Sequence, residues 1–229
     1  MNSIAEKTIK KNGYNLHFIP TKKFKTLTFV AKLGAPLKSE SITKRALLPS
    51  VLREATKNYP TRQALQLKLD DLYGAVLTID GVKKGEKHII SFRMEVANEK
   101  FLPDQENVTE EALKLLKELL FEPYLENNVF SEKIVDREKI TLQQKIQAIR
   151  DDKMRYANIR LIDEMCKDEP YSIHVNGYES DLATIDHHNL YQYYQDMLAN
   201  DQLDIYVVGD IDVEAREETI NSTFDLNDR

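Results

Sequence analysis

Histidine and cysteine side chains are the first places to look for chemistry in this chain. His187 and His188 are adjacent, and neighbouring side chains on a helix diverge by about 100°, so the two are not expected to ligate one metal ion together. Cys166 follows Met165 and is interpreted as a packed helix residue rather than a nucleophile. Serine, histidine and aspartate all occur, but geometry and not sequence spacing defines a catalytic triad. The patterns G-x-G-x-x-G, G-x-x-x-x-G-K-[ST] and C-x-x-C are absent from the sequence.

A proline inside a predicted helix is the most unusual local feature. Residues 46–50 read ALLPS, within the stretch SESITKRALLPSVLREATKNYP (39–60), whose apolar residues recur at helical spacing. Pro49 has no N–H to donate, and a proline in a helix interior removes one backbone hydrogen bond. We predict that Pro49 is tolerated because it comes early in the helix, where only a first-turn amide or one carbonyl is lost.

The elements that must position these residues are alternating strands and helices. Ser41 or Thr43 is expected to cap the first helix, residues 81–87 to form a long turn, and Asp151 and Asp152 to interrupt the longest helix. The order of the elements predicts an α+β fold, with a mixed, largely antiparallel sheet and helices packed on one face. The predicted strands are 14–20, 26–33, 75–80, 88–97 and 203–211, and the predicted helices are 41–58, 61–74, 109–121, 131–166, 184–199 and 213–220.

Composition and charge exclude several classes of protein. The 229 residues are 41% hydrophobic and 31% charged, which is an ordinary soluble composition, and the formal net charge is −6. A negative chain without a basic stripe does not favour binding to nucleic acid. The sequence contains no run of ~18 apolar residues, the length that is needed to span a membrane. The N-terminus lacks the apolar core of a signal peptide. Because a single cysteine cannot form an intramolecular disulfide, a cytoplasmic location is expected.

Five stretches, in order, resemble the N-terminal domain of the insulinase/pitrilysin family, the inverted zincins that include the mitochondrial processing peptidases. The family pattern has two strands, a helix with H-x-x-E-H, a connection ending in Tyr-Pro, a helix leading to a glycine, a strand pair, a long acidic helix and a Val-Val-Gly-Asp strand. The five stretches are TLTFVAKLGAP (26–36), RALLPSVLREATKNYP (45–60), LKLDDLYGAVLTID (67–80), the stretch from FSEKIVDREKI to DLATI (130–185) and LDIYVVGDID (203–212), so the likeness covers roughly residues 10–220.

This resemblance places the H-x-x-E-H motif on residues 46–50. Ala46 and Ser50 then replace the two histidines, and Pro49 replaces the glutamate. In active members, histidines at i and i+4 bind zinc and the glutamate polarises the metal-bound water. Ala46 and Pro49 have no donor atoms, and a serine hydroxyl is a poor zinc ligand. Since no histidine occurs between positions 17 and 88, no shift of register restores the site, and neither zinc nor another cofactor is expected.

The family's third zinc ligand is a glutamate on the long helix, seven residues after another acidic residue. The matching stretch is DREKITLQQKI (136–146), in which Glu138 is retained and Lys145 replaces the ligand. We hypothesise that the Lys145 ammonium pairs with Glu138 or Glu54 and so holds the two helices together, because a buried unpaired lysine would be destabilising.

The resemblance implies a non-catalytic subunit that assembles with an active homologue. Copies without zinc commonly pair with active copies in this family, and the sequence resembles in particular the insulinase-like proteins of Gram-positive bacteria that are encoded beside an active partner. The expected partners are an active homologue and a peptide substrate, with a homodimer as another assembly; neither nucleic acid nor membrane is expected. The alternative function is a metallopeptidase or another hydrolase that uses an unrecognised site.

Two further expectations concern the domain and its sheet edge. Family members usually have two such domains in tandem, so residues 1–220 are expected to form the first and 221–229 to begin a linker to the second. Active members hold substrate as an added strand on a sheet edge near the metal. The corresponding edge strand here lacks the family's Asn-Ala-x-Thr, and a plain or partner-covered strand is the competing interpretation. Its candidate peptide-binding residues are Val76, Leu77, Thr78 and Ile79.

Overall fold

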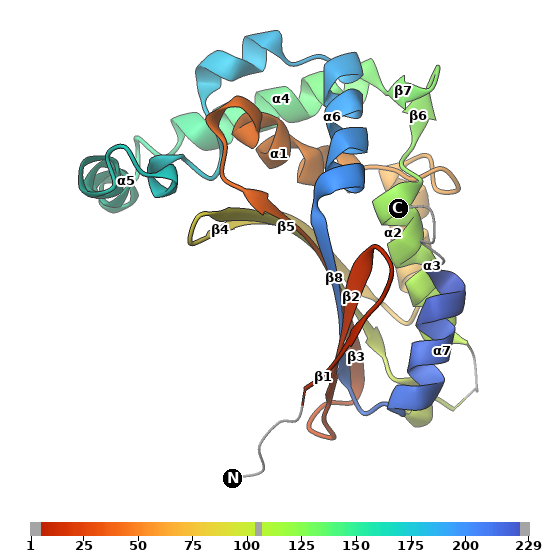
Figure 1. The fold of residues 1–229 in the computed structure, drawn as a ribbon. Coiled ribbons are helices and arrows are strands. Elements are labelled where there is room, and N and C mark those ends of the chain that lie inside the picture. Colours follow the sequence, from red (N-terminus) through yellow and green to blue (C-terminus); the bar gives the residue numbers. More distant parts are fainter. Residues whose placement is uncertain (1–5, 104–106, 225–229) are drawn as a thin grey trace.

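A six-stranded sheet forms the centre of the computed structural model, which describes residues 6–103 and 107–224. Its strands lie in the order β1-β2-β8-β3-β5-β4 (Figure 1). β2 and β8 are parallel, and the other four neighbouring pairs are antiparallel. The strands are β1 Lys7–Lys10, β2 Tyr14–Pro20, β3 Thr26–Pro36, β4 Val76–Lys84, β5 Lys87–Ala97 and β8 Gln202–Gly209.

One face of this sheet is apolar because alternate residues of each strand point toward it. On β3, Leu27, Phe29 and Ala31 are fully buried, whereas the residues between them are only half-buried. The strand register places Phe29 beside Val207 on β8 and beside Met94 on β5, and both neighbours are also fully buried. A continuous apolar layer therefore crosses the middle of the sheet.

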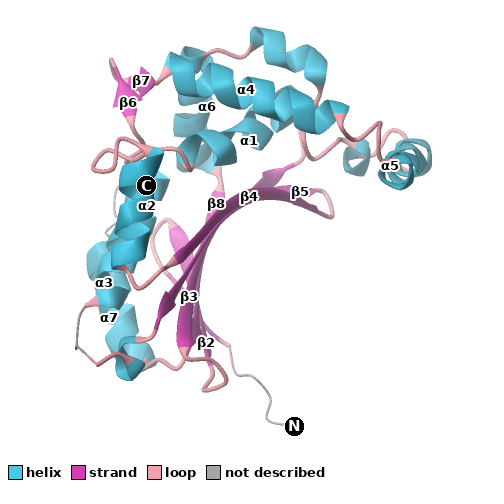
Figure 2. Ribbon diagram, turned by 180° about the vertical axis from the view of Figure 1, so that it is seen from behind, coloured by secondary structure: helices cyan, strands magenta, loops and turns pink. Residues whose placement is uncertain are grey.

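Helices cover this apolar face, and no described helix packs on the opposite face (Figure 1, Figure 2). On α3, Leu113, Leu116 and Leu120 are fully buried because they recur three and four residues apart along the helix. These findings confirm the predicted α+β fold with a largely antiparallel sheet. The helices are α1 Ser39–Leu52, α2 Arg62–Asp71, α3 Val108–Phe121, α4 Glu132–Gln147, α5 Lys153–Met165, α6 His187–Asn200 and α7 Val213–Thr223; short 3-10 turns cover Glu99–Phe101, Pro170–Ser172 and Glu179–Thr184, and a small hairpin joins β6 Leu125–Glu126 to β7 Val129–Phe130.

Helix α1 differs from its prediction at both ends. It begins two residues earlier than predicted and has no side-chain cap, so neither Ser41 nor Thr43 serves as one; the Thr43 hydroxyl instead donates to Asp181 at 2.5 Å. The helix ends at Leu52 and not at residue 58. Pro49 therefore lies in the last turn and not early in the helix, and the carbonyl four residues before it loses its usual partner.

Two other predictions about the elements differ from the structure, and a third agrees with it. The sequence patterns do not predict β1, although the Asn-Gly pair between β1 and β2 is a hairpin signal. The predicted long turn over 81–87 is wrong, because β4 and β5 stay paired as far as Lys84 and Lys87 and leave only Gly85 and Glu86 to turn the chain. The predicted break in the longest helix is confirmed, and Asp152 caps α5 by accepting a hydrogen bond from the N–H of Arg155 at 3.0 Å.

The predicted linker begins inside a helix. α7 continues to Thr223, and residues 225–229 lie outside the described residues. Among the helices of residues 6–103 and 107–224, none is long and apolar enough to cross a membrane.

Candidate functional site

The positions assigned to the zinc site lie on two helices in contact, α1 and α4 (Figure 2). On α1, Ala46 and Ser50 are half-buried and Pro49 is buried. On α4, Glu138 is buried and Lys145 is exposed. In the part of the chain that the structure describes, no group of three or more His, Cys, Asp or Glu side chains could hold a metal ion.

The hypothesis that Lys145 bridges the two helices is wrong. Its exposed side chain forms no ion pair with the described residues. Arg137 makes the bridge instead: its guanidinium contacts the carboxylate of Glu54, which follows α1, and its Nε lies 3.0 Å from Glu138 Oε1 on α4. Arg62, at the start of α2, adds a longer contact of 3.8 Å to Glu54. The hydrogen bond to Glu138, together with the charge of Glu54, raises the pKa of Arg137. One guanidinium thus joins two buried carboxylates.

Arg45 is fully buried. It directly precedes ALLPS (46–50), the stretch that the resemblance aligns with H-x-x-E-H and that we call the degenerate motif. Its Nη1 donates to Asp201 Oδ2 at 2.6 Å and to the Tyr193 hydroxyl at 3.3 Å. Its Nη2 donates to the carbonyls of Leu33 and His88 at 3.1 and 3.3 Å, and its Nε donates to His88 Nδ1 at 3.2 Å. A buried cation is tolerated when it is paired and its N–H groups are satisfied. Arg45 therefore fixes α1 against β3, β5 and the residue that follows α6.

His88 is neutral in this arrangement. Arginine has no acceptor, so Nδ1 of His88 must accept the hydrogen bond from Arg45 and the ring proton is assigned to Nε2. Burial, and then the charge of Arg45, lower the pKa of His88 to about 4. A Cβ on Gly81 would lie 2.8 Å from His88 Cε1, so the facing strand needs glycine at this position.

Among residues 6–103 and 107–224, the other chemically active side chains do not form a catalytic group. The rings of His187 and His188 do not diverge as predicted, since their centroids lie 4.2 Å apart at the start of α6. Cys166 is half-buried at the residue that follows α5. His174 Nε2 lies 2.7 Å from Asp163 Oδ1, which is the second half of a triad, but within the described residues no serine, threonine or cysteine side chain is hydrogen-bonded to His174.

Strand β4 is the outer strand at one end of the sheet, as the resemblance implies for its counterpart. Val76 and Thr78 are exposed, Leu77 is half-buried and Ile79 is buried against the helices. β4 pairs with β5, and its other edge presents backbone N–H and C=O groups that could pair with an added strand. Because β4 also contacts α1, this edge runs beside the helix that carries ALLPS.

The far end of β4 is fastened to the segment that follows α5. Lys83 Nζ donates to the carbonyls of Tyr171 and Ile173 at 2.6 and 3.0 Å, and it lies 4.1 Å from the centroid of the Tyr171 ring. Lys83 therefore orders this segment against the edge strand.

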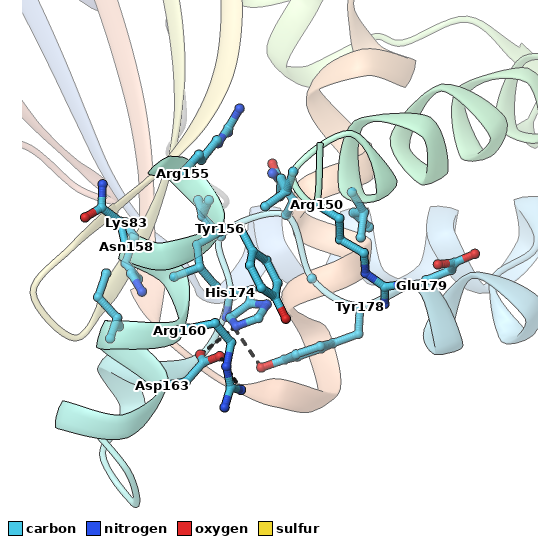
Figure 3. A pocket seen from close by; sticks show the side chains of 17 residues that line it. Lys83, Arg150, Arg155, Tyr156, Asn158, Arg160, Asp163, His174, Tyr178 and Glu179 are labelled. Carbon is cyan, nitrogen blue, oxygen red and sulfur yellow. Dashed lines mark hydrogen bonds and ion pairs between the residues drawn. The ribbon is translucent and has the colours of Figure 1, made fainter. Parts of the chain in front are cut away.

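A pocket of about 460 Å³ opens between the end of β4, the end of α4, α5 and residues 174–179 (Figure 3). Isoleucines from α4, from the turn that follows it and from α5 line this pocket. Two glutamine side chains, Gln143 and Gln147, donate to Glu179 at its rim and hold the pKa of that carboxyl below its usual value, and Arg150 adds to this effect. The isoleucines are Ile146, Ile149, Ile159 and Ile162.

Known proteins resemble this chain in sequence or in fold. No family model matches the chain. The chain is 47% identical over 229 residues to the probable inactive metalloprotease YmfF of Bacillus subtilis (strain 168) and covers 54% of that protein, so it spans about half the length of this curated relative.

Solved structures extend the comparison. A conserved protein from Enterococcus faecalis V583 matches with a TM-score of 0.88 and 34% identity, over 96% of this chain and 52% of that one. The peptidase M16 inactive domain from Pseudomonas fluorescens matches with a TM-score of 0.74 and 15% identity, over 96% of this chain and 50% of that one; this likeness shows the fold alone. In sequence the chain is therefore similar to a probable inactive metalloprotease, and in fold to an M16 peptidase inactive domain, as the resemblance predicts.

Proposed function

We propose that this chain is part of a non-catalytic, insulinase-like homologue of a zinc peptidase, which binds peptide along β4 and acts together with an active homologue. The observation that carries the proposal is the combination of an available edge strand with a helix pair that lacks zinc-binding side chains at Ala46, Ser50 and Lys145. Peptide addition at a sheet edge needs backbone groups and no metal, so this function can persist without zinc. We further propose a cytoplasmic location, which the lone cysteine supports.

Metal binding tests the assignment of the degenerate motif. In equilibrium dialysis followed by metal quantification, the wild-type chain is expected to bind no stoichiometric zinc. The triple variant Ala46→His, Ser50→His, Lys145→Glu is expected to gain one zinc ion per chain, because it restores three ligands on two contacting helices. The matched control carries the two histidines and keeps Lys145, and it should bind zinc more weakly. Tight stoichiometric binding by the wild type would contradict the proposal.

Strand addition is tested with N-methylated peptides. Two versions of one nine-residue peptide carry N-methyl groups on alternate residues, in opposite phases, so that each version lacks one of the two sets of N–H groups of a strand. In fluorescence anisotropy, the version whose methyl groups face β4 should lose binding, while the other phase keeps it. Equal affinity of the two versions would exclude pairing at the edge.

The partner is tested by peptidase assays. The chain alone should not cleave peptides. Cleavage should be faster in a mixture of this chain with an insulinase-family peptidase that has an intact H-x-x-E-H motif than with that peptidase alone. The mixture should keep its activity when Ser50→Ala is introduced here. Metal-dependent or metal-independent cleavage by the chain alone would favour the alternative function, a hydrolase with an unrecognised site.

A further inference from the structure

The pocket beside β4 is lined by more cations than carboxylates, although the chain as a whole is negative. The chain carries a formal net charge of −6, yet four cationic side chains line this pocket and only two carboxylates do. These charged residues come from β4, from the turn after α4, from α5 and from the 174–179 segment (Figure 3). The cationic residues are Lys83, Arg150, Arg155 and Arg160, and the acidic residues are Asp163 and Glu179.

Most of these charges are already paired within the pocket. Asp163 contacts His174 at 2.7 Å and Arg160 at 3.4 Å. Lys83 is held by two backbone carbonyls, and Glu179 accepts hydrogen bonds from two glutamines. Within the described residues, the guanidinium of Arg155 has no hydrogen bond and no ion pair. The lining therefore contains a cation whose partner is not supplied by this part of the chain.

A second polar group of the pocket has no hydrogen-bond partner in the part of the chain that the structure describes. Asn176 lines the pocket, is only 7% exposed and makes no side-chain hydrogen bond with the described residues. Its amide is not among the buried polar atoms of the described residues that lack a partner, so the amide reaches solvent and is open to a hydrogen bond from a ligand. The isoleucine walls, in contrast, favour an apolar group of the ligand.

We propose that this pocket binds a peptide segment in which an aliphatic side chain stands next to a carboxylate. The side chain occupies the isoleucine walls, the carboxylate pairs with Arg155 with support from Arg150, and the adjoining peptide group reaches Asn176. Lys83 fastens the pocket to the end of β4, so a peptide laid along that edge leads to the pocket. The inference rests on the proposed function in this respect, and it adds the class of peptide that is selected.

The experiment measures the affinity of three labelled nine-residue peptides by fluorescence anisotropy. They differ at one central position, where leucine is followed by glutamate, glutamine or lysine. The glutamate peptide should bind about tenfold more tightly than the glutamine peptide, which corresponds to one charge-assisted hydrogen bond, and the lysine peptide should bind most weakly. A further pair that ends in leucine, with a free or an amidated C-terminus, shows whether a terminal carboxylate serves as well as a side-chain carboxylate.

Two variants of the chain locate the effect. Arg155→Glu should abolish the preference for glutamate or reverse it. Lys153→Glu makes the same charge change on the same exposed helix but outside the pocket lining, and it should leave the order of the three peptides unchanged. Equal affinities of the three peptides, or equal effects of the two variants, would overturn the inference.

The outcomes separate this inference from the proposed function. If only one of the two N-methylated versions loses binding and the peptides show no charge preference, strand addition is supported and the pocket assignment is rejected. A charge preference that depends on Arg155, without any phase dependence, would support the pocket and reject strand addition. If no peptide binds at millimolar concentration, both are rejected.

Discussion

Acid should destabilise this protein through His88. The ring is fully buried, and its Nδ1 accepts a hydrogen bond from Arg45 Nε at 3.2 Å. Burial first, and the charge of Arg45 second, lower the pKa of His88 from 6.5 to about 4. Between these two values the unfolded chain binds a proton that the folded chain does not, so the free energy of unfolding falls as the pH falls. One pKa unit corresponds to about 1.4 kcal/mol, and the shift is therefore worth roughly 3 kcal/mol.

The sign of this effect defines the pH window. The stabilisation is fully present above the unfolded-state pKa of 6.5 and is lost as the pH falls toward the folded-state pKa of about 4. The assay is urea unfolding followed by circular dichroism at fixed pH values from 7 to 4. The matched variant is His88→Asn, because an amide oxygen can accept the Arg45 hydrogen bond and does not titrate.

The result is read as a difference between two slopes. Carboxylates titrate in both proteins, so their contribution cancels when the slope of unfolding free energy against pH is compared. The wild type should be steeper by up to about 1.4 kcal/mol per pH unit between pH 6.5 and 4. Equal slopes for the wild type and the His88→Asn variant would refute the reasoning.

Two further predictions concern contacts around the helix pair and the pocket. Arg137→Ala should lower the free energy of unfolding by about 1–2 kcal/mol in urea titrations, because it leaves two buried carboxylates without their shared donor, whereas Arg53→Ala, an exposed arginine without an ion pair among the described residues, should change it little. Gly177→Ala should lower the melting temperature and the stability by about 2–4 kcal/mol, because a Cβ there would lie 2.2 Å from Thr43 Oγ1 at a φ of +69°. The control Gly34→Ala has no atom within 4 Å of its added Cβ, and a loss of stability as large as that of Gly177→Ala would contradict the steric argument.

Much of the fold could be predicted because burial on one face imposes a period on each element. Alternating apolar residues identified β2 and β3, a hairpin pattern identified β5, a mostly apolar run identified β8, and the helical period identified the helices that cover the sheet. Element ends were less predictable, since a turn depends on contacts from elsewhere in the chain. β1 is one example, because its four residues, Lys7–Lys10, are exposed or half-buried and leave little apolar signal. The predicted long turn before β5 is another, because polar lysines can also occupy the exposed end of a hairpin.

The absence of zinc ligands could be predicted from the sequence, because it depends only on which side chains are present. The contacts of Arg45 could not be predicted, because they depend on residues that are distant in sequence. The sequence alone is sufficient to see that Ala46 cannot bind zinc. The buried state of Arg45 could not be anticipated, because a charged residue in a helical pattern usually faces solvent. Its partners Leu33, His88 and Asp201 are distant in sequence, and only the fold brings them together.

Helices α1 and α4, to which the resemblance assigns the zinc site, are held together by residues other than those at the assigned ligand positions. Arg45 attaches α1 to the sheet, and Arg137 connects Glu54 and Glu138 beside the same helix pair. In an active homologue, as the resemblance implies, zinc would link these helices through other positions. Since different residues support the fold and the assigned metal site, the zinc ligands can be replaced without removing the walls of the neighbouring site that we propose for peptide. Edge strand β4 and the pocket beside it therefore do not require the metal for their structure.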